Sequence, residues 1–284
     1  MPSIASIVTA SDLTMRSTLA LQRALRLKQQ FGAQLTLLHV VDGAPADPAQ
    51  AEHGRRRAKE LLQAQVRSAC EGETRRLWLK VVEGERDATI ITESEQAGAD
   101  LIVLGDGRKP GWREGFVGTT TERIVRLSEC PVLMVRQPTN GPHRRLFCPF
   151  DGSPAACRAL RIALSVANEA ECLVMHADET RMLVQWATRQ AGDALTKRHI
   201  DTVMTELRAT LQRLAPLALE PQLRVVEGNA HVLIREQMRD FGPDLVALGT
   251  HARSRVVTAF LGSLARDLLT DTDCDVLITV PGRP

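Results

Sequence analysis

Short apolar runs alternate with longer segments of helical periodicity along the whole chain. In the first half, the apolar runs predict strands at residues 4–10, 35–41, 78–82, 101–104 and 132–135. The segments between them predict helices at 16–31, 49–69, 87–97 and 119–127. The buried face of the first helix is expected to hold Leu19, Leu21, Ala24, Leu25 and Leu27.

The second half shows the same order of elements. Its strands are predicted at about residues 145–150, 172–177, 222–226, 245–248 and 276–280. Near-continuous apolar strands separated by helices are typical of a parallel sheet covered on both faces. We therefore predict an α/β protein with two tandem doubly wound, Rossmann-like or flavodoxin-like domains of five strands each. In such folds ligands bind at the carboxyl ends of the strands, where the strand order reverses.

The two halves also repeat each other in sequence. Residues 81–84 recur at 225–228, and Asp100–Gly105 recurs as Asp244–Gly249, each 144 positions later. Residues 130–133 recur at 274–277 with the same offset, while His39 matches His176, 137 positions on. Ordered matches at this spacing indicate a duplicated domain. A cluster of proline and glycine between the copies marks a linker. We place the first domain at 1–138, the linker at 139–144 and the second domain at 145–284.

The loop after the fourth strand of each half is rich in glycine and leads into a helix. Gly105 and Gly118 are 13 positions apart, as are Gly249 and Gly262, and each later glycine precedes a hydroxyl residue. Glycine lets a backbone approach an anion, and the free N–H groups at a helix start attract phosphate. A hydroxyl residue there can donate to the anion or cap the helix. The pattern thus fits a phosphate loop, and it also fits a plain helix start after a tight turn.

At these residues the chain resembles the universal stress protein family. That family has a Gly-x-x-Gly-(nine residues)-Gly-Ser/Thr nucleotide loop after strand 4 and an aspartate after strand 1. Its last strand reads Cys-Pro-Val-Leu-x-Val, which is found here at Cys130–Val135. The resemblance covers the chain as two tandem copies. It implies the strand order 3-2-1-4-5, pairing of the two last strands (132–135 and 276–280) in an intramolecular pseudo-dimer, and binding of ATP with Mg²⁺.

Carried over residue by residue, the resemblance gives two candidate nucleotide sites. The second half contributes Asp151, Gly249, His251, Ala252, Arg253, Gly262 and Ser263. The first half contributes Asp12, Val40, Gly105, Arg108, Gly118 and Thr119. The aspartates are expected at the nucleoside and Val40 near adenine. Ala252 and Arg108 stand where the family has its second loop glycine. We expect the second half to be the better site, with weaker ATP binding than in members that keep every glycine.

Composition narrows the classes of function. Lys and Arg total 36 against 34 for Asp and Glu, and aromatic residues make up 3% with no tyrosine. The charge balance argues against a dedicated nucleic-acid binder, and the scarcity of aromatic residues argues against a base-stacking surface. No apolar run is long enough to span a membrane, and the start lacks the pattern of a signal peptide, so a cytoplasmic protein is expected. The six cysteines form no Cys-x-x-Cys pair, which indicates buried free thiols.

The histidines and a search for enzyme motifs give little indication of catalysis. His39 and His176 end equivalent strands, where a packed or hydrogen-bonded role is expected, whereas His251 lies in the candidate loop. The other histidines lack the spacing of metal ligands. The chain has no Gly-Lys-Ser/Thr, Gly-x-Ser-x-Gly or His-Glu-x-x-His motif. No residue stands out as a general base, so at most slow ATP hydrolysis is expected.

Three hypotheses follow. The first is a non-catalytic module that binds adenine nucleotide and acts in a stress response, as a homodimer of tandem chains. The second is a degenerate tandem scaffold that works through protein contacts or another small ligand. The third is a slow ATPase or nucleotide-transfer enzyme, with His251 and Arg253 as the candidate groups.

Overall fold

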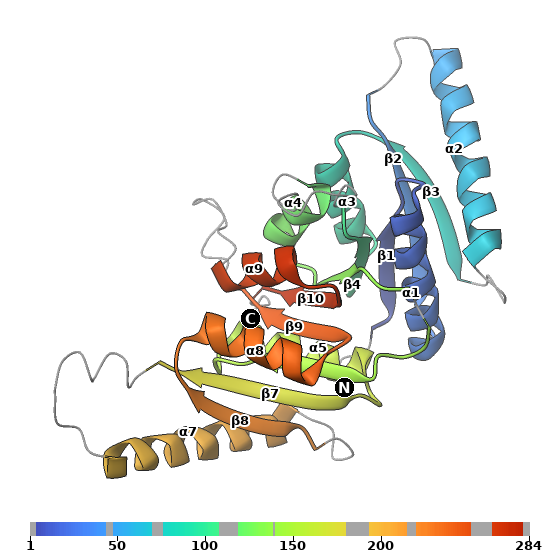
Figure 1. Cartoon of the computed structure of the whole chain (residues 1–284). Helices are drawn as coiled ribbons and strands as arrows, with labels where there is room; N and C mark the ends of the chain where they lie inside the picture. The colour runs from blue at the N-terminus through green and yellow to red at the C-terminus, as the bar shows by residue number, and fades with distance from the viewer. Residues whose placement is uncertain are drawn as a thin grey trace. The chain divides into compact units, whose positions relative to one another are not determined.

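The computed structural model describes residues 4–43, 48–69, 76–107, 119–138, 140–179, 193–214, 220–250 and 263–280. These residues form two compact units (Figure 1). The first unit contains the first half of the sequence, up to Asn140, together with residues 263–280. The second unit contains the described residues from Gly141 to Thr250. Each unit is described by itself below, and the boundary between sequence domains at 139–144 stays a prediction.

The first unit contains a parallel sheet whose strand order is β3-β2-β1-β4-β5. This order confirms the arrangement that the family resemblance implies. Its strands lie within one or two residues of the predicted runs, because buried strands are almost continuously apolar. Their bounds are β1 Ser6–Ala10, β2 Gln34–Val41, β3 Leu77–Glu83, β4 Leu101–Gly105 and β5 Val132–Val135.

The helices of the first unit cover both faces of this sheet. Helices α1 (Met15–Phe31) and α2 (Pro48–Ala69) contact each other and pack on one face. Helices α3 (Arg86–Gln96) and α4 (Thr120–Leu127) contact each other and lie on the opposite face (Figure 1). The unit also contains α9 (Ser263–Asp271) and the strand β10 (Asp275–Thr279).

The buried face of α1 differs in part from the prediction. Leu21, Ala24 and Leu27 are buried as expected, but Leu19 and Leu25 are only half-buried. Arg23 also lies on the buried face, together with Ser17 and Ala20, and the leucine pattern predicted none of the three. A charged residue can lie there because a carboxylate from a distant strand meets it, as described below.

The last strand, β10, pairs antiparallel with β5. Val276, Leu277 and Ile278 face Met134, Leu133 and Val132 in register, and every residue of both strands is buried. This pairing of the two predicted last strands is confirmed. It also protects β5 from becoming an exposed sheet edge, which would invite aggregation.

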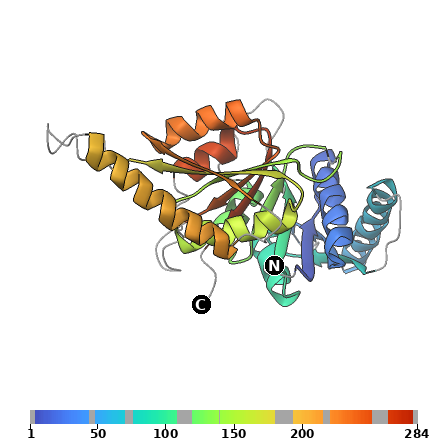
Figure 2. The same ribbon diagram turned by 90° about the horizontal axis from the view of Figure 1, so that it is seen from below.

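The second unit repeats the parallel arrangement, with strand order β8-β7-β6-β9. The strands are β6 Arg145–Pro149, β7 Glu171–Asp178, β8 Gln222–Glu227 and β9 Leu245–Gly249. Helices α5 (Pro154–Val166) and α7 (Asp193–Leu214) pack on one face and α8 (Ala230–Phe241) on the other (Figure 2). Both units are thus α/β layers, which confirms the predicted fold class. No helix among the described residues is long and apolar enough to cross a membrane.

The described cysteines are free thiols. Cys148, Cys172 and Cys274 are buried as predicted, whereas Cys130 and Cys157 are only half-buried. Burial away from water disfavours the thiolate and raises the pKa of Cys172 and Cys274 to about 12. Burial also raises the pKa of Cys148 well above the ordinary value.

These pKa shifts predict a loss of stability in alkali. A raised pKa in the folded state favours folding below the unfolded value, and this contribution is lost as pH rises toward the folded value. The free energy of unfolding should therefore fall between about pH 9 and pH 12. Urea titrations across this range, repeated with the Cys172→Ser and Cys274→Ser variants, would measure it. If both variants lose free energy of unfolding with rising pH as steeply as the wild type does, the assignment to these thiols is contradicted.

Candidate functional site

A tight turn follows β1 and holds the predicted site residue Asp12. The Asp12 Oδ1 atom accepts hydrogen bonds from the Thr14 backbone N–H at 3.1 Å and from its hydroxyl at 2.6 Å. Leu13 adopts a φ of 65°, which this Asx-type turn stabilises. Burial tends to raise the pKa of the Asp12 carboxyl, but the hydrogen bonds from Thr14 and Ser17 outweigh it and lower the pKa. Asp12 is thus an exposed, ionised carboxylate where β1 meets α1.

The second half builds the same turn after β6. The Asp151 Oδ1 atom accepts from the Ser153 N–H at 2.9 Å, and Gly152 supplies the positive φ of 74°. Thr14 caps α1 and Ser153 caps α5, each accepting from the N–H three residues later. The structure therefore places Asp12 and Asp151 at equivalent positions, at the carboxyl end of the first strand of each half. Their contact with a nucleoside stays a prediction.

Two equivalent histidines form hydrogen bonds with the backbone next to these turns. Nδ1 of His39 lies 2.8 Å from the Ser11 carbonyl oxygen, and Nδ1 of His176 lies 2.8 Å from that of Phe150. A carbonyl only accepts, so Nδ1 carries the proton in both rings. The predicted hydrogen-bonded role of the two histidines is confirmed. The neighbouring Val40 is 9% exposed, so it offers little surface to the adenine that the resemblance places near it.

Gly105 and Gly249, which end β4 and β9, are required for helix packing. A Cβ atom on Gly105 would lie 2.8 Å from the Arg16 carbonyl oxygen, and one on Gly249 would lie 2.2 Å from the Ala156 nitrogen. Neither glycine has a positive φ. The close approach that they permit here is therefore that of the first turn of α1 to Gly105 and of α5 to Gly249, a reason that sequence reasoning missed. Their role toward an anion stays a prediction.

The start of α4 meets the end of β4. Thr119 caps α4 by accepting from the Glu122 N–H at 3.1 Å, and the Thr121 hydroxyl donates to the Gly105 carbonyl at 2.9 Å. A Cβ on Gly107 would lie 3.3 Å from the Thr119 Cβ. We call the ends of β1 and β4 with the start of α4 the first site. Gly105 and Gly107 lie beside this helix start, but the predicted loop glycine Gly118 falls outside the described residues, so the phosphate loop stays a prediction.

The family resemblance predicts a second site made of Asp151, Gly249, the loop residues and Ser263, and we keep the name second site for this prediction. Ser263 is the first residue of α9, as predicted. The loop residues of both sites fall outside the described part of the chain. They are Arg108 and Gly118 in the first half, and His251, Ala252, Arg253 and Gly262 in the second. Their predicted roles stay predictions.

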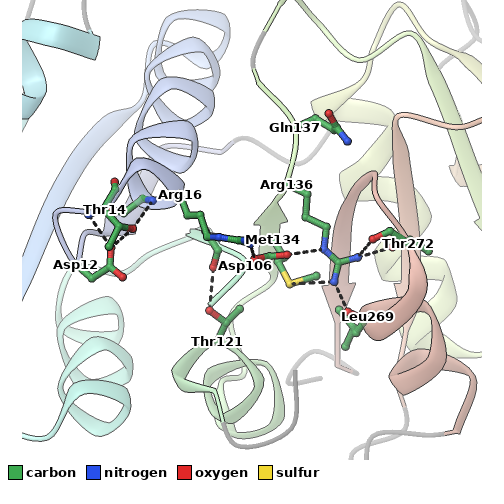
Figure 3. Close-up of polar contacts among 12 residues, drawn as sticks. Asp12, Thr14, Arg16, Asp106, Thr121, Met134, Arg136, Gln137, Leu269 and Thr272 are labelled. Atoms are coloured by element: carbon green, nitrogen blue, oxygen red, sulfur yellow. Dashed lines mark hydrogen bonds and ion pairs between the residues drawn. The ribbon is translucent and has the colours of Figure 1, made fainter. Parts of the chain in front are cut away.

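A buried charged cluster, which the sequence reasoning missed, lies at the first site (Figure 3). Asp106, directly after β4, is 1% exposed and forms ion pairs with both Arg16 and Arg136. Arg16 comes from the first turn of α1, and Arg136 follows β5. The Arg136 Nε atom lies 3.3 Å from the second carboxylate oxygen of Asp106.

Arg136 also holds the end of α9. Its guanidinium donates to the Leu269 and Thr272 carbonyl oxygens and, at 2.6 Å, to the Thr272 hydroxyl. The backbone N–H of Arg136 donates to Asp275 at 2.9 Å, and the other carboxylate oxygen of Asp275 lies 3.3 Å from Nε of Arg23. These contacts join α1, β5, α9 and β10 within the first unit.

The aligned positions of the second half do not carry the charged residues of this cluster. Ala155, Thr250 and Val280 take the places of Arg16, Asp106 and Arg136 when the halves are aligned on Asp12 and Asp151 and on the two glycine loops. This difference between aligned repeats is the signal in the sequence that could have revealed the cluster. Within the described residues no group of three or more His, Cys, Asp or Glu side chains could hold a metal ion.

The comparison with protein families agrees with this geometry in both halves. A family model described as the universal stress protein family matches residues 4–136 and again residues 142–280. The chain belongs to the universal stress protein family. It carries two copies of the family's domain, as predicted from the repeats.

Individual relatives support the same assignment. A universal stress protein of Methanocaldococcus jannaschii is 29% identical over 139 residues, which is 46% of this chain and 82% of the relative. One from Mycobacterium tuberculosis is 22% identical, and the match spans 63% of this chain and 61% of that protein, less than two thirds of its length. A crystal structure of a universal stress protein from Archaeoglobus fulgidus has a TM-score of 0.73 at 18% identity, covering 99% of this chain and all of that one. At that identity the structural likeness shows the fold alone.

Proposed function

We propose that this universal stress protein is a non-catalytic regulatory module that binds ATP at the carboxyl ends of its parallel strands. The observation that carries the proposal is the meeting of Gly107 with the capped start of α4, where the positive end of the helix dipole faces the end of β4. The exposed carboxylate of Asp12 follows the neighbouring strand, β1, and can accept hydrogen bonds from a ribose. Family membership supports the same assignment for the second site.

The second site is proposed to bind more tightly. At the first site, Asp106 and Arg16 already form an ion pair, so a polyanion has to displace an existing contact. At the second site, the equivalent residues are Ala155 and Thr250, which carry no charge. The proposal for the second site rests on this difference and on Ser263 as the residue that opens α9.

Replacing Ser263 by aspartate tests the second site. A carboxylate at the first residue of α9 repels a phosphate, so the affinity of that site for magnesium ATP should fall by roughly a hundredfold. Isothermal titration of the full chain measures this effect, and Ser263→Thr, which keeps the hydroxyl, serves as the matched control. If both variants bind as the wild type does, the ligand binds elsewhere.

The two remaining hypotheses give different results in the same experiments. A degenerate scaffold is favoured by one observation, namely that the polar groups of Asp12 and Asp106 find partners within the protein itself. It predicts neither nucleotide released from freshly purified protein on denaturation nor any heat of ATP binding. An enzyme would show turnover that depends on His251. The proposed homodimer of tandem chains is tested by light scattering on the same samples.

A further inference from the structure

Arg16 and Asp106 differ sharply in how firmly each is held. The side chain of Arg16 is 40% exposed, whereas that of Asp106 is 1% exposed. Asp106 is also paired with Arg136, whose side chain is 2% exposed and whose guanidinium donates to α9. If Arg16 moves away, Asp106 therefore keeps a buried cationic partner. Arg16 is the member of the cluster that can leave at little cost.

The position of Arg16 brings this movable charge to the first site. The Arg16 carbonyl lies against Gly105, the residue that ends β4, and Thr121 in the first turn of α4 donates to the same glycine. Figure 3 shows Arg16, Asp106 and Thr121 gathered at this point, with Asp12 and Thr14 on the turn before α1. A guanidinium beside a helix start is well suited to bind phosphate, because it supplies several donors in one plane.

We propose that Arg16 is a polyphosphate ligand of the first site, held back by Asp106 when no ligand is bound. A polyphosphate that enters draws Arg16 away from Asp106, and Asp106 stays neutralised by Arg136. The inference rests on the proposed function, since it names a residue that binds the phosphates of the same ligand. The second site has Ala155 and Thr250 at these positions and therefore lacks this competition.

Two substitutions that break the same ion pair should change binding in opposite directions. Arg16→Ala removes the guanidinium that would bind the phosphates, so the affinity of the first site for polyphosphate should fall about tenfold or more. Asp106→Asn removes the competitor and leaves Arg16 free, so affinity should rise by about threefold to tenfold. Both variants lose the ion pair between Arg16 and Asp106, and Asp106→Asn also weakens the pair with Arg136. A purely structural role of the cluster would therefore lower affinity in both variants.

The experiment is isothermal titration of the full-length chain, with magnesium ATP and with inorganic tripolyphosphate as separate probes. Both variants are made in the Ser263→Asp background, so that the first site dominates the heat. Thermal melts of each variant confirm folding. Asp106→Thr, which copies the residue of the second half, serves as a second variant if Asp106→Asn fails to fold.

Weaker binding by Arg16→Ala together with tighter binding by Asp106→Asn supports the inference, and the reverse pattern overturns it. Changes of the same sign, no change in either, or no binding of either probe to any variant overturns it. The supporting pattern with tripolyphosphate, but no tighter binding of ATP, upholds Arg16 as a ligand while contradicting the proposed adenine-nucleotide function. If the affinity for ATP is unchanged by both substitutions, the proposed function is upheld and the role of Arg16 is rejected.

Discussion

Replacing Asp275 by alanine is expected to lower the free energy of unfolding by about 3–5 kcal/mol, because it leaves a buried arginine without its carboxylate. Asp275 is fully buried, and one of its oxygens lies 3.3 Å from Nε of Arg23, whose side chain is also buried. The other oxygen accepts from the backbone N–H groups of Arg136 and Gln137 at 2.9 and 3.2 Å. These donors would lose their acceptor in the same substitution.

The matched control for this prediction is Asp273→Ala. Asp273 is exposed and lies two residues away, so its replacement should change stability by less than about 0.5 kcal/mol. Equilibrium unfolding in urea, followed by circular dichroism, measures both variants. A loss of less than about 1 kcal/mol for Asp275→Ala would mean that water solvates Arg23 after the substitution, and that α1 is not held to β10 by this pair.

The strands and their order were the most predictable part of the fold. Buried parallel strands leave an unbroken apolar run, and Leu101–Leu104 and Val132–Val135 were read from such runs almost to the residue. The order of the strands is a different matter, because periodicity along the chain says nothing of which strand lies beside which. It came from the family resemblance, and the register of β1 with β2 and β4 confirms it.

The buried charges were not predictable by the same reasoning. Arg16 and Arg23 lie on an amphipathic helix, where an arginine is expected to face water. Arg23 is buried and Arg16 is half-buried because they pair with Asp275 and Asp106, which are 252 and 90 positions further along the chain. Only folding brings these partners together. The glycine loops were found, but the clash that a Cβ on Gly105 would meet comes from α1, which local sequence cannot show.

The two halves therefore share the backbone turns around their first strands but differ in the charged side chains beside them. The turns at Asp12 and Asp151 and the histidines behind them are the same in both. These contacts depend on the strands and the first helix, which the duplication copied. The cluster around Asp106 lies where the two halves differ in sequence, so we expect the two sites to differ in affinity rather than in the kind of ligand.

Replacing Gly249 by alanine is expected to destabilise the protein by about 3 kcal/mol, at the upper end of the usual cost of overpacking. The new Cβ would lie 2.2 Å from the Ala156 nitrogen and 2.4 Å from the Ala155 carbonyl carbon. Both are backbone atoms in the first turn of α5, so no side chain can move aside to relieve the clash. The helix has to shift away from β9, which also displaces the turn at Asp151.

A series of three glycine-to-alanine variants separates the effect of this clash from any general effect of replacing glycine by alanine. Gly105→Ala should cost less, because its Cβ would meet the Arg16 carbonyl oxygen at 2.8 Å. Gly54 lies within α2 with no atom near its Cβ position, so Gly54→Ala should stabilise the protein by about 0.5–1 kcal/mol through helix propensity. Urea unfolding should give the lowest free energy of unfolding for Gly249→Ala, a higher one for Gly105→Ala and the highest for Gly54→Ala. Equal stability of Gly249→Ala and Gly54→Ala would show that α5 does not pack on β9 as closely as the structure has it, and the packing role assigned to both site glycines would fail with it.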